Sequence, residues 1–289
     1  MDKKKVKKVL LIGLGSIGKK HARILKQIKP NIEIHRLIRK KSLLPNHPDI
    51  DSNIYSLEDA LRLSPDMAII SNPSSAHIAS ATPLAKHGIN LLIEKPISNS
   101  INELDSFKAL IKKTKIKVLV GYNLRFSRSL NFFKRKIQSG YLGRIIFLES
   151  SVGQNLKTWR NNHDYENNVT AHKKLGGGVL LELSHEIDYL NWIFGRIKWV
   201  SSFIEKASDL KINVEDSVNS ILRFEKNSFN SREFTGYLKM DMYRDYHTRF
   251  CRVDGTKSSI MWDGIRNQVK EFSKKEKKWK IIYKDNSSK

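Results

Sequence analysis

Three glycines near the start of the chain have a spacing that can hold a dinucleotide. The stretch VLLIGLGSIGKKH places Gly13, Gly15 and Gly18 in the pattern GxGxxG, after an apolar run and before an amphipathic stretch. In such a turn the first glycine permits the bend, the second lets the backbone approach a pyrophosphate, and the third lets the helix pack on the strand. We therefore expect Gly13, Gly15, Ser16, Ile17 and Gly18 to contact a dinucleotide at a helix N-terminus. The alternative is a glycine turn that binds no ligand.

Basic residues stand where such a fold often has an acidic one. About twenty residues after the glycines, a carboxylate would bind the hydroxyls of the adenosine ribose. The sequence has Arg39 and Lys40 near that position, followed by a further lysine and a serine. A guanidinium can bind a 2′-phosphate that a carboxylate would repel. We predict NADP as the preferred cofactor over NAD, with Arg39 and Lys40 as contacts. The alternative is ordinary surface charge in a lysine-rich protein.

Composition limits the class of protein. The chain has 289 residues, of which 39% are hydrophobic, and this is enough for one large or two medium domains. Its single cysteine, Cys251, excludes an internal disulfide. No apolar run approaches the roughly twenty residues that a membrane-spanning helix needs. We therefore expect a cytoplasmic protein with no membrane partner.

The net charge of +24 invites a nucleic-acid interpretation. However, the lysines and arginines are spread over both ends of the chain and the presumed helix faces between them, and no nucleic-acid-binding module is recognisable. We predict a solvated basic surface and no nucleic-acid partner. A basic nucleic-acid-binding protein is the alternative, and its affinity would fall steeply with salt.

The first 120 residues alternate short apolar runs with amphipathic stretches, which predicts a parallel sheet covered by helices. The expected strands are Val9–Ile12, Ile32–Ile38, Met67–Ser71, Leu91–Glu94 and Val118–Val120. The expected helices are Ser16–Lys29, Leu57–Arg62, His77–His87 and Ile101–Lys113. The fold class is therefore α/β, with a doubly wound Rossmann domain over residues 1–120.

The second half has more strands with fewer helices between them, which favours antiparallel pairing. The expected strands are Ile145–Val152, Trp199–Glu205, Ser217–Phe224, Glu233–Met242 and Arg249–Val253. One long helix is expected from Gly178 to Phe194. We predict a C-terminal α+β domain over residues 121–289, with an open and mostly antiparallel sheet. The final polar residues are expected to be disordered.

Several stretches together resemble one family of oxidoreductases. In chain order they are GLGSIGKKH, SNPSSAH, EKPIS, GYNLRFS and GGGVLLELSHEIDYLNWIFG. They are similar to motifs of the glucose–fructose oxidoreductase, inositol dehydrogenase and MocA (Gfo/Idh/MocA) family. The resemblance implies NAD(P)-dependent hydride transfer at a hydroxyl or carbonyl carbon of a small sugar-like substrate. It also implies a homo-oligomer formed through the C-terminal sheet. The stretches DYENNVTAHKKLGGG and SHEIDYL resemble a branch found near surface-sugar and nonulosonic-acid biosynthesis genes.

The motif Glu94-Lys95-Pro96 closes a predicted strand at the carboxyl edge of the sheet, where open α/β sheets bind ligands. The Lys95 ammonium can stabilise a developing alkoxide there, and Pro96 is a candidate for a cis peptide bond. The resemblance implies that Lys95 is a catalytic residue beside the nicotinamide and that Glu94 lies near the nicotinamide ribose. The alternative is a surface ion pair. Further cofactor contacts are expected from the residues that follow the strand at 67–71, namely Ser71, Asn72, Pro73 and His77.

His185 is the candidate general acid and base, because an imidazole can accept a hydroxyl proton as a hydride leaves and return it in reduction. A lone histidine on such a helix is more often structural, and the family motif favours the catalytic role. The family commonly has an aspartate four residues earlier, where this chain has Leu181. Glu182 is the candidate replacement, and Asp188 is the alternative orienting group. On one continuous helix Glu182, His185 and Asp188 would share a face.

A second group of residues is expected to bind substrate. The start of the second domain should face the cleft, and an aromatic face beside a guanidinium suits a sugar ring that carries a carboxylate or phosphate. The candidates are Tyr122, Asn123, Arg125, Trp159, Arg160, Asp164, Tyr165, Thr170, His172, Lys173 and Asp188. For each of the loop residues among them, the alternative is an ordinary surface residue that does not contact a ligand.

No metal site is expected, because the nine histidines lack ligand spacings such as HExxH and Cys251 has no partner cysteine. Family members usually continue to a C-terminal helix, whereas this chain ends at KIIYKDNSSK. This departure and Glu182 favour a second alternative, a non-catalytic sensor that keeps the cofactor-binding fold. The presence of both Lys95 and His185 favours the enzyme.

Overall fold

The computed structural model describes residues 6–38, 47–159 and 165–286. The chain forms two compact units, and each is described by itself. The first unit is Met1–Gly121 together with Lys174–Gly176, and the second is Tyr122–Lys173 together with Gly177–Lys289. In the described ranges no helix is long and apolar enough to cross a membrane.

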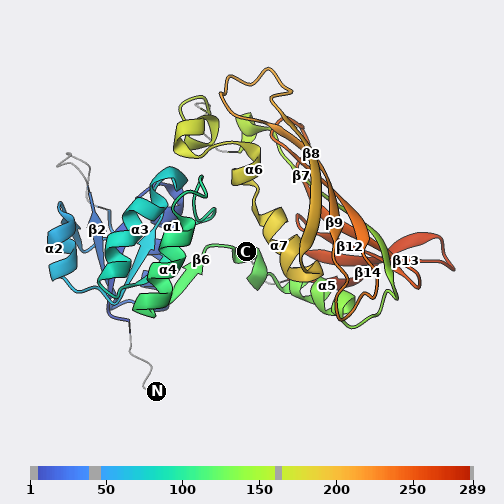
Figure 1. Cartoon of the computed structure of the whole chain (residues 1–289), viewed down its shortest axis with the longest axis horizontal. Helices are drawn as coiled ribbons and strands as arrows, with labels where there is room; N and C mark the ends of the chain where they lie inside the picture. The colour runs from blue at the N-terminus through green and yellow to red at the C-terminus, as the bar shows by residue number, and fades with distance from the viewer. Residues whose placement is uncertain (1–5, 39–46, 160–164, 287–289) are drawn as a thin grey trace. The chain divides into compact units, whose positions relative to one another are not determined.

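The first unit is a six-stranded parallel sheet with helices between its strands (Figure 1). The sheet has the order β3-β2-β1-β4-β5-β6. The strands are β1 (Lys8–Ile12), β2 (Glu33–Leu37), β3 (Ser52–Ile54), β4 (Met67–Ile70), β5 (Asn90–Ile93) and β6 (Val118–Val120). The helices are α1 (Ser16–Ile28), α2 (Leu57–Arg62), α3 (His77–Lys86) and α4 (Leu104–Thr114). The predicted doubly wound sheet is confirmed, with the additional strand β3 and a later start of α4.

The central strands of this sheet are buried on both faces, which explains their continuous apolar runs. Leu10 and Ile12 of β1 pack in one cluster with residues of α2, α3 and α4. Val9 and Leu11 of the same strand pack in another cluster, with Ala22 of α1. The strand order reverses at β1, so its carboxyl end and that of β4 flank the crevice where doubly wound folds bind ligands.

The second unit is an eight-stranded sheet with helices on one face (Figure 1). Its order is β14-β13-β12-β11-β7-β10-β9-β8, and every neighbouring pair is antiparallel except β7 and β10. The strands are β7 (Ile145–Gly153), β8 (Ile197–Glu205), β9 (Ser217–Phe224), β10 (Phe234–Asp241), β11 (Thr248–Gly255), β12 (Ser259–Asp263), β13 (Gln268–Ser273) and β14 (Lys278–Lys284). The predicted mostly antiparallel sheet is confirmed.

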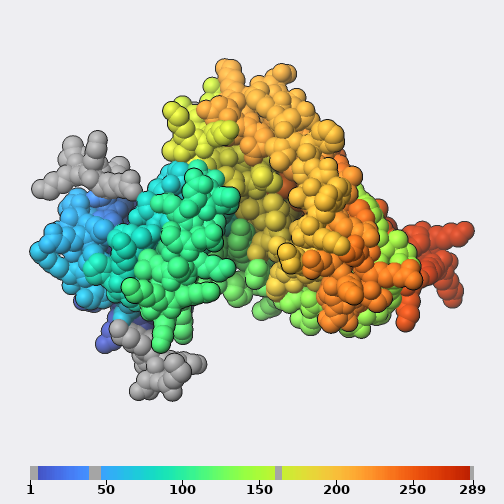
Figure 2. Space-filling view, in the orientation of Figure 1, coloured from blue at the N-terminus to red at the C-terminus, as the bar shows by residue number. Residues whose placement is uncertain are grey.

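The helices of this unit are α5 (Arg128–Gln138), α6 (Val179–Glu182) and α7 (His185–Phe194). Helices α5 and α7 share the hydrophobic core with the sheet, and Trp262 of β12 donates a hydrogen bond of 3.0 Å to Ser129 of α5. Cys251 of β11 lies fully buried in this core, and its burial raises the pKa of the thiol. The hairpin of β13 and β14, red in the figures, projects from the rest of the unit (Figures 1 and 2).

The single helix expected from Gly178 to Phe194 is wrong. The chain leaves the helical conformation at Leu183, with φ −100° and ψ 23°, and α7 begins at His185. The junction is a tight turn in which the amides of Ser184 and Glu186 each bond to a carbonyl three residues back. Glu182 and His185 therefore belong to two helical segments, and their spacing does not place them on one continuous helix face.

Candidate functional site

The glycine loop between β1 and α1 is held against the end of β4. Gly13 has φ +92°, and a Cβ atom there would lie 2.5 Å from the backbone nitrogen of Asn72. A Cβ atom on Gly18 would collide with the carbonyl of Gly13 and lie 2.9 Å from Oγ of Ser71. Oγ of Ser71 donates to the Gly13 carbonyl at 2.8 Å. Two of the three glycines are therefore required by packing within the protein.

The middle glycine differs from the other two, because among the described residues no heavy atom lies within 4 Å of a Cβ atom built on Gly15. Gly15 is the N-cap of α1, and neither a side-chain cap nor an acidic residue of the first turn occupies this helix end. Ser16 and Ile17 are also exposed. As far as the described residues go, the loop thus presents an open helix N-terminus and open backbone at the predicted pyrophosphate position.

His77 lies between the segments that follow β4 and β5, beside the glycine loop. It is buried, and its ring nitrogens lie 2.9 Å from the Pro96 carbonyl and 2.8 Å from the Asn72 carbonyl. Burial lowers the pKa of His77, while the two carbonyls and the charge of Glu94 oppose that shift. A neutral imidazole donates through only one nitrogen, so His77 bonds to one of these carbonyls at a time. Both nitrogens face the backbone, and this arrangement suits a role in holding the segments that follow β4 and β5 in place.

Glu94 is held by groups from several parts of the first unit. Its Oε1 accepts a hydrogen bond of 2.6 Å from Nε2 of His21, and its Oε2 accepts one of 3.2 Å from the backbone nitrogen of Lys95. The peptide bond between Lys95 and Pro96 is cis, which confirms the expectation at Pro96. His21 received no role from the sequence, because nothing in its local pattern indicates a partner 73 residues away.

In the second unit, glycines and an acidic residue shape the start of α6. Gly178 has φ +105°, and a Cβ atom there would collide with the carboxylate of Glu215. That carboxylate accepts a hydrogen bond of 3.1 Å from the backbone nitrogen of Leu180, so it caps the helix. Glu182, at the end of this short helix, accepts a hydrogen bond of 2.9 Å from the buried hydroxyl of Thr170.

The predicted substrate residues at the start of the second unit are paired with side chains of α7. The ring of Tyr122 meets that of His185 edge-on, with centroids 5.6 Å apart. Arg125 forms a bidentate ion pair with Asp188 at 2.7 and 2.9 Å, and this pairing raises the pKa of the guanidinium. Burial, and then the charge of Asp188, raises the pKa of Tyr122 despite opposing interactions. The structure thus brings together four of the residues that the sequence singled out.

Further candidate substrate residues lie in the loop after β7. Trp159 and Tyr165 are partly buried and pack against the core of the second unit. The hydroxyl of Tyr165 also accepts a hydrogen bond of 3.3 Å from the backbone nitrogen of Lys211. These contacts give both aromatic residues a packing role. Arg39, Lys40, Arg160 and Asp164 lie outside the described residues.

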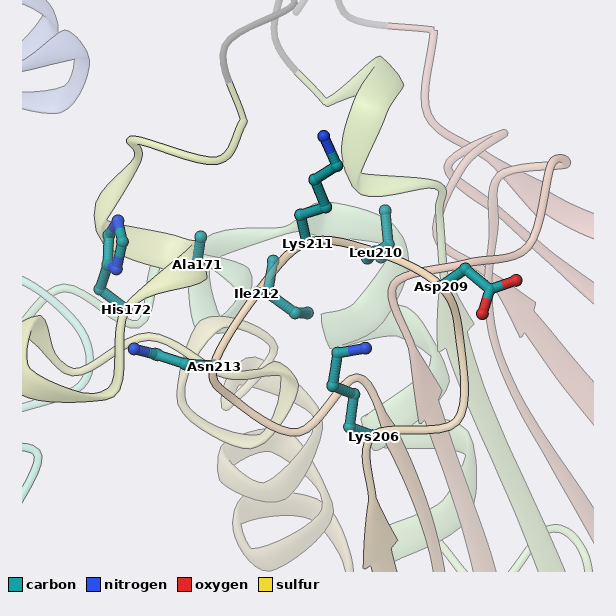
Figure 3. A pocket seen from close by; sticks show the side chains of 8 residues that line it. All are labelled: Ala171, His172, Lys206, Asp209, Leu210, Lys211, Ile212 and Asn213. Carbon is teal, nitrogen blue, oxygen red and sulfur yellow. The ribbon is translucent and has the colours of Figure 1, made fainter.

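One pocket of the second unit, of about 490 Å³, lies beside the segment that carries Thr170 and His172 (Figure 3). It is lined by Ala171, His172, Lys206, Asp209, Leu210, Lys211, Ile212 and Asn213. The segment 206–213 curves around this pocket, and Lys206 points into the space that it encloses (Figure 3). The ammonium of Lys206 donates to the Ser208 carbonyl at 2.9 Å. Asp209 points away from this space, and the amides of Ile212 and Asn213 bond to carbonyls of the protein. This loop mainly satisfies its own polar groups.

Within the described ranges, no group of three or more histidine, cysteine, aspartate or glutamate side chains could hold a metal ion.

The polar side chains of the two units can be compared by the partners that they contact. In the first unit Ser71 and His77 bond to backbone carbonyls, and Glu94 pairs with the side chain of His21. In the second unit the ring of Tyr122 contacts that of His185, Arg125 pairs with Asp188, and Thr170 donates to Glu182.

The chain combines a parallel Rossmann sheet with a second unit that has a large mixed sheet. Residues 7–122 match the model of the oxidoreductase family with an NAD-binding Rossmann fold, and residues 131–261 match that of the GFO/IDH/MocA C-terminal domain. The chain belongs to the Gfo/Idh/MocA family.

Two relatives illustrate the range of the family. The chain is 23% identical over 195 residues to 2,7-anhydro-N-acetylneuraminate hydratase of Mediterraneibacter gnavus, with 64% of this chain and 48% of that protein covered. It is 25% identical over 258 residues to glucose-6-phosphate 3-dehydrogenase of Bacillus subtilis, with 86% of this chain and 69% of that protein covered. The chain thus spans about half the length of the first of these relatives.

Solved structures show the same fold. The WlbA dehydrogenase from Bordetella pertussis, in complex with NADH and UDP-GlcNAcA, is similar with a TM-score of 0.80 at 19% identity. That similarity covers 98% of this chain and 79% of the other. At this level of identity the likeness concerns the fold alone.

Proposed function

We propose that this chain is an NAD(P)-dependent oxidoreductase that transfers a hydride between nicotinamide and a hydroxyl or carbonyl carbon of a sugar or sugar-derived acid. The observation that carries the proposal is the glycine loop of a family with an NAD-binding Rossmann fold. Gly13 and Gly18 are enclosed by the protein, whereas Gly15 opens the backbone at the N-terminus of α1. A pyrophosphate suits this combination of open amides and a helix dipole.

The proposal assigns a role to each candidate of the reaction. A bound dinucleotide supplies the hydride acceptor or donor. His185 takes the proton of the substrate hydroxyl in the oxidation and returns it in the reduction. Lys95, which follows the carboxyl end of β5, stabilises the charge that develops on the reacting oxygen. Glu182 is the carboxylate that supports this proton transfer, with its hydrogen bond from Thr170 fixing its orientation.

The substrate class rests on the relatives and on the charges of the second unit. The relatives' names include a sugar-acid hydratase, a sugar-phosphate dehydrogenase and a dehydrogenase with a bound UDP-sugar acid. Asp188 already compensates the charge of Arg125, so we assign recognition of a substrate anion to the loop that contains Arg160. We place this reaction in surface-glycan biosynthesis, in the cytoplasm, on the sequence motifs given above.

We also propose NADP as the preferred cofactor, with Arg39 and Lys40 binding its 2′-phosphate. β2 ends at Leu37, two residues before Arg39, and β2 pairs with β1, which precedes the glycine loop. This order along the sheet is the one that brings the end of the second strand to the adenosine ribose in such folds.

The experiment is a titration of the purified protein with NADPH and with NADH, followed by nicotinamide fluorescence. Tighter binding of NADPH is expected. Arg39→Asp should shift the ratio of the two affinities toward NADH by about tenfold or more, since it replaces an attractive charge with a repulsive one. An unchanged ratio would remove Arg39 from the cofactor site, and failure of the folded protein to bind either would contradict the proposed function.

A panel of sugar phosphates, sugar acids and nucleotide-linked sugar acids then tests turnover. Nicotinamide absorbance reports oxidation or reduction, and proton NMR of the substrate reports a change without net oxidation, because one relative is named a hydratase. The non-catalytic sensor is the second candidate, favoured by the helix break that separates Glu182 from His185. Tight dinucleotide binding without any chemical change across the panel would support it.

We further propose that the chain forms a homo-oligomer through its C-terminal sheet. Trp199 and Phe203 of β8 and Ile221 of β9 are 54%, 78% and 47% exposed, and the strand register places all three on the face opposite the helices. Apolar side chains this exposed are typical of a surface that a partner covers. Sedimentation velocity should show a species heavier than the 33.4 kDa monomer, and a monomer at all concentrations would contradict the proposal.

A further inference from the structure

We infer that His21 is a positioning residue, which orients the Glu94 carboxylate and through it the backbone at Lys95. The inference rests on the proposed function, in which Lys95 acts at the reacting oxygen. His21 lies in α1, the helix that starts at the glycine loop, and Glu94 follows β5. The pair therefore links the helix of the dinucleotide fingerprint to the segment that carries the candidate catalytic lysine.

The geometry leaves the carboxylate little freedom. Nε2 of His21 donates to Oε1 at 2.6 Å, and it must carry the proton because a carboxylate only accepts. Oε2 accepts from the backbone nitrogen of Lys95 at 3.2 Å. A Cβ atom on Gly121, just after β6, would lie 2.9 Å from Oε2, so the absence of a side chain there makes room for this orientation. The side chains of His21 and Glu94 are only 22% and 13% exposed.

This arrangement predicts how a change at His21 reaches Lys95. A carboxylate is planar, so rotating it to find a new partner for Oε1 also moves Oε2 away from the Lys95 amide. Hydrogen bonds to a charged group are among the strong ones, and a partly buried carboxylate that loses one will reorient. Small displacements of a catalytic group lower the rate much more than they change binding of a ligand held elsewhere.

The test compares His21→Leu, which removes the donor, with His21→Gln, whose amide nitrogen can take the place of Nε2. His21→Leu should lower kcat by about tenfold to a hundredfold, and the KM for the dinucleotide should change by a smaller factor, since the glycine loop is untouched. His21→Gln should recover kcat to within about fivefold. His87→Gln is the matched control, since His87 is an exposed histidine at the end of α3. An equal loss in the two His21 variants would overturn the inference, because the hydrogen bond would then be irrelevant.

The double variant separates positioning from a purely structural role. His21→Leu combined with Glu94→Gln should lose no more kcat than the worse single variant, since both changes disable one unit. Losses that multiply would show independent roles and overturn the inference. A purely structural role predicts a lower melting temperature with an unchanged kcat per dinucleotide-binding site, and that result would also overturn it.

A readout that needs no turnover keeps the inference separate from the proposed function. Hydrogen–deuterium exchange of the segment 94–98 should speed up at the Lys95 amide in His21→Leu by about tenfold or more and stay near the wild-type rate in His21→Gln. If the wild-type protein binds no dinucleotide, the proposed function fails while this exchange result still decides whether His21 orders the Lys95 backbone. Equal exchange in all variants would overturn the inference even in an active enzyme.

Discussion

The two units differ in how most of their candidate site residues are held. In the first unit, Ser71 and His77 bond to the backbone around the glycine loop, and Glu94, which pairs with the side chain of His21, is an exception. In the second unit, side chains bond to one another, as Arg125 does to Asp188. Backbone can bind a cofactor common to a whole family, whatever the side chains are. Paired side chains can change with the substrate, and this difference suits a fold that keeps its cofactor while its substrates vary.

The largest effect that tests this comparison is expected from one residue of each unit. Lys95→Ala and His185→Ala should each lower turnover by about two to four orders of magnitude, because one removes charge stabilisation and the other removes proton transfer. Dinucleotide affinity should remain, since neither change alters the glycine loop. Steady-state kinetics and fluorescence titration measure the two quantities. Turnover like that of the wild type in either variant would exclude that residue from the mechanism.

A pair of glycine variants sharpens the comparison within the first unit. Gly18→Ala forces a methyl group against the Gly13 carbonyl and should destabilise the protein by about 1–3 kcal/mol. Gly15→Ala adds its methyl group in open space and should leave the unfolding midpoint unchanged, yet weaken dinucleotide binding. Chemical denaturation and the fluorescence titration check both halves. Equal stability of the two variants would mean that the loop is less tightly packed than described.

The smallest expected effect concerns His77 and pH. Burial lowers its pKa from the ordinary value of 6.5, so the folded state prefers the neutral imidazole. The contribution of His77 to the free energy of unfolding is therefore fully present above pH 6.5. It should fall as the pH drops through 6.5 toward the lower pKa of the folded state. Denaturation curves between about pH 7.5 and 5 should show this slope, and it should be reduced in His77→Gln. The same slope in both proteins would place the titrating group elsewhere.

The sequence predicted the first unit better than the second, for a physical reason. Parallel strands buried on both faces are continuous apolar runs, so β1, β4 and β5 were recognisable. The strand β12 was missed, and so were β13 and β14, because lysines occupy much of the stretch between Gln268 and Lys284 and mask the alternation of these two strands. Apart from the half-buried Lys270, the lysines there lie on exposed positions of a projecting hairpin, where burial does not select apolar side chains.

The positions of candidate site residues in the fold were predictable where those residues belong to a local sequence motif. The glycine pattern and the Glu94-Lys95-Pro96 motif were identified correctly as elements of the sheet edge, including the cis peptide bond. The helix break at Leu183 was not predictable, since no glycine or proline stands between Val179 and Phe194 to mark it. The partnership of His21 with Glu94 depends on the folded sheet, and the packing of Trp159 into the core depends on elements distant in the sequence.

The seclusion of Cys251 has a practical consequence for studying motion. A thiol that is fully buried and difficult to ionise reacts slowly with maleimides, so the folded protein behaves toward such reagents as though it had no cysteine. A cysteine engineered into an exposed site of either unit would then be the position that takes up the dye. A pair of such sites, one in each unit, would allow single-molecule fluorescence to follow the separation of the units as dinucleotide and sugar are added.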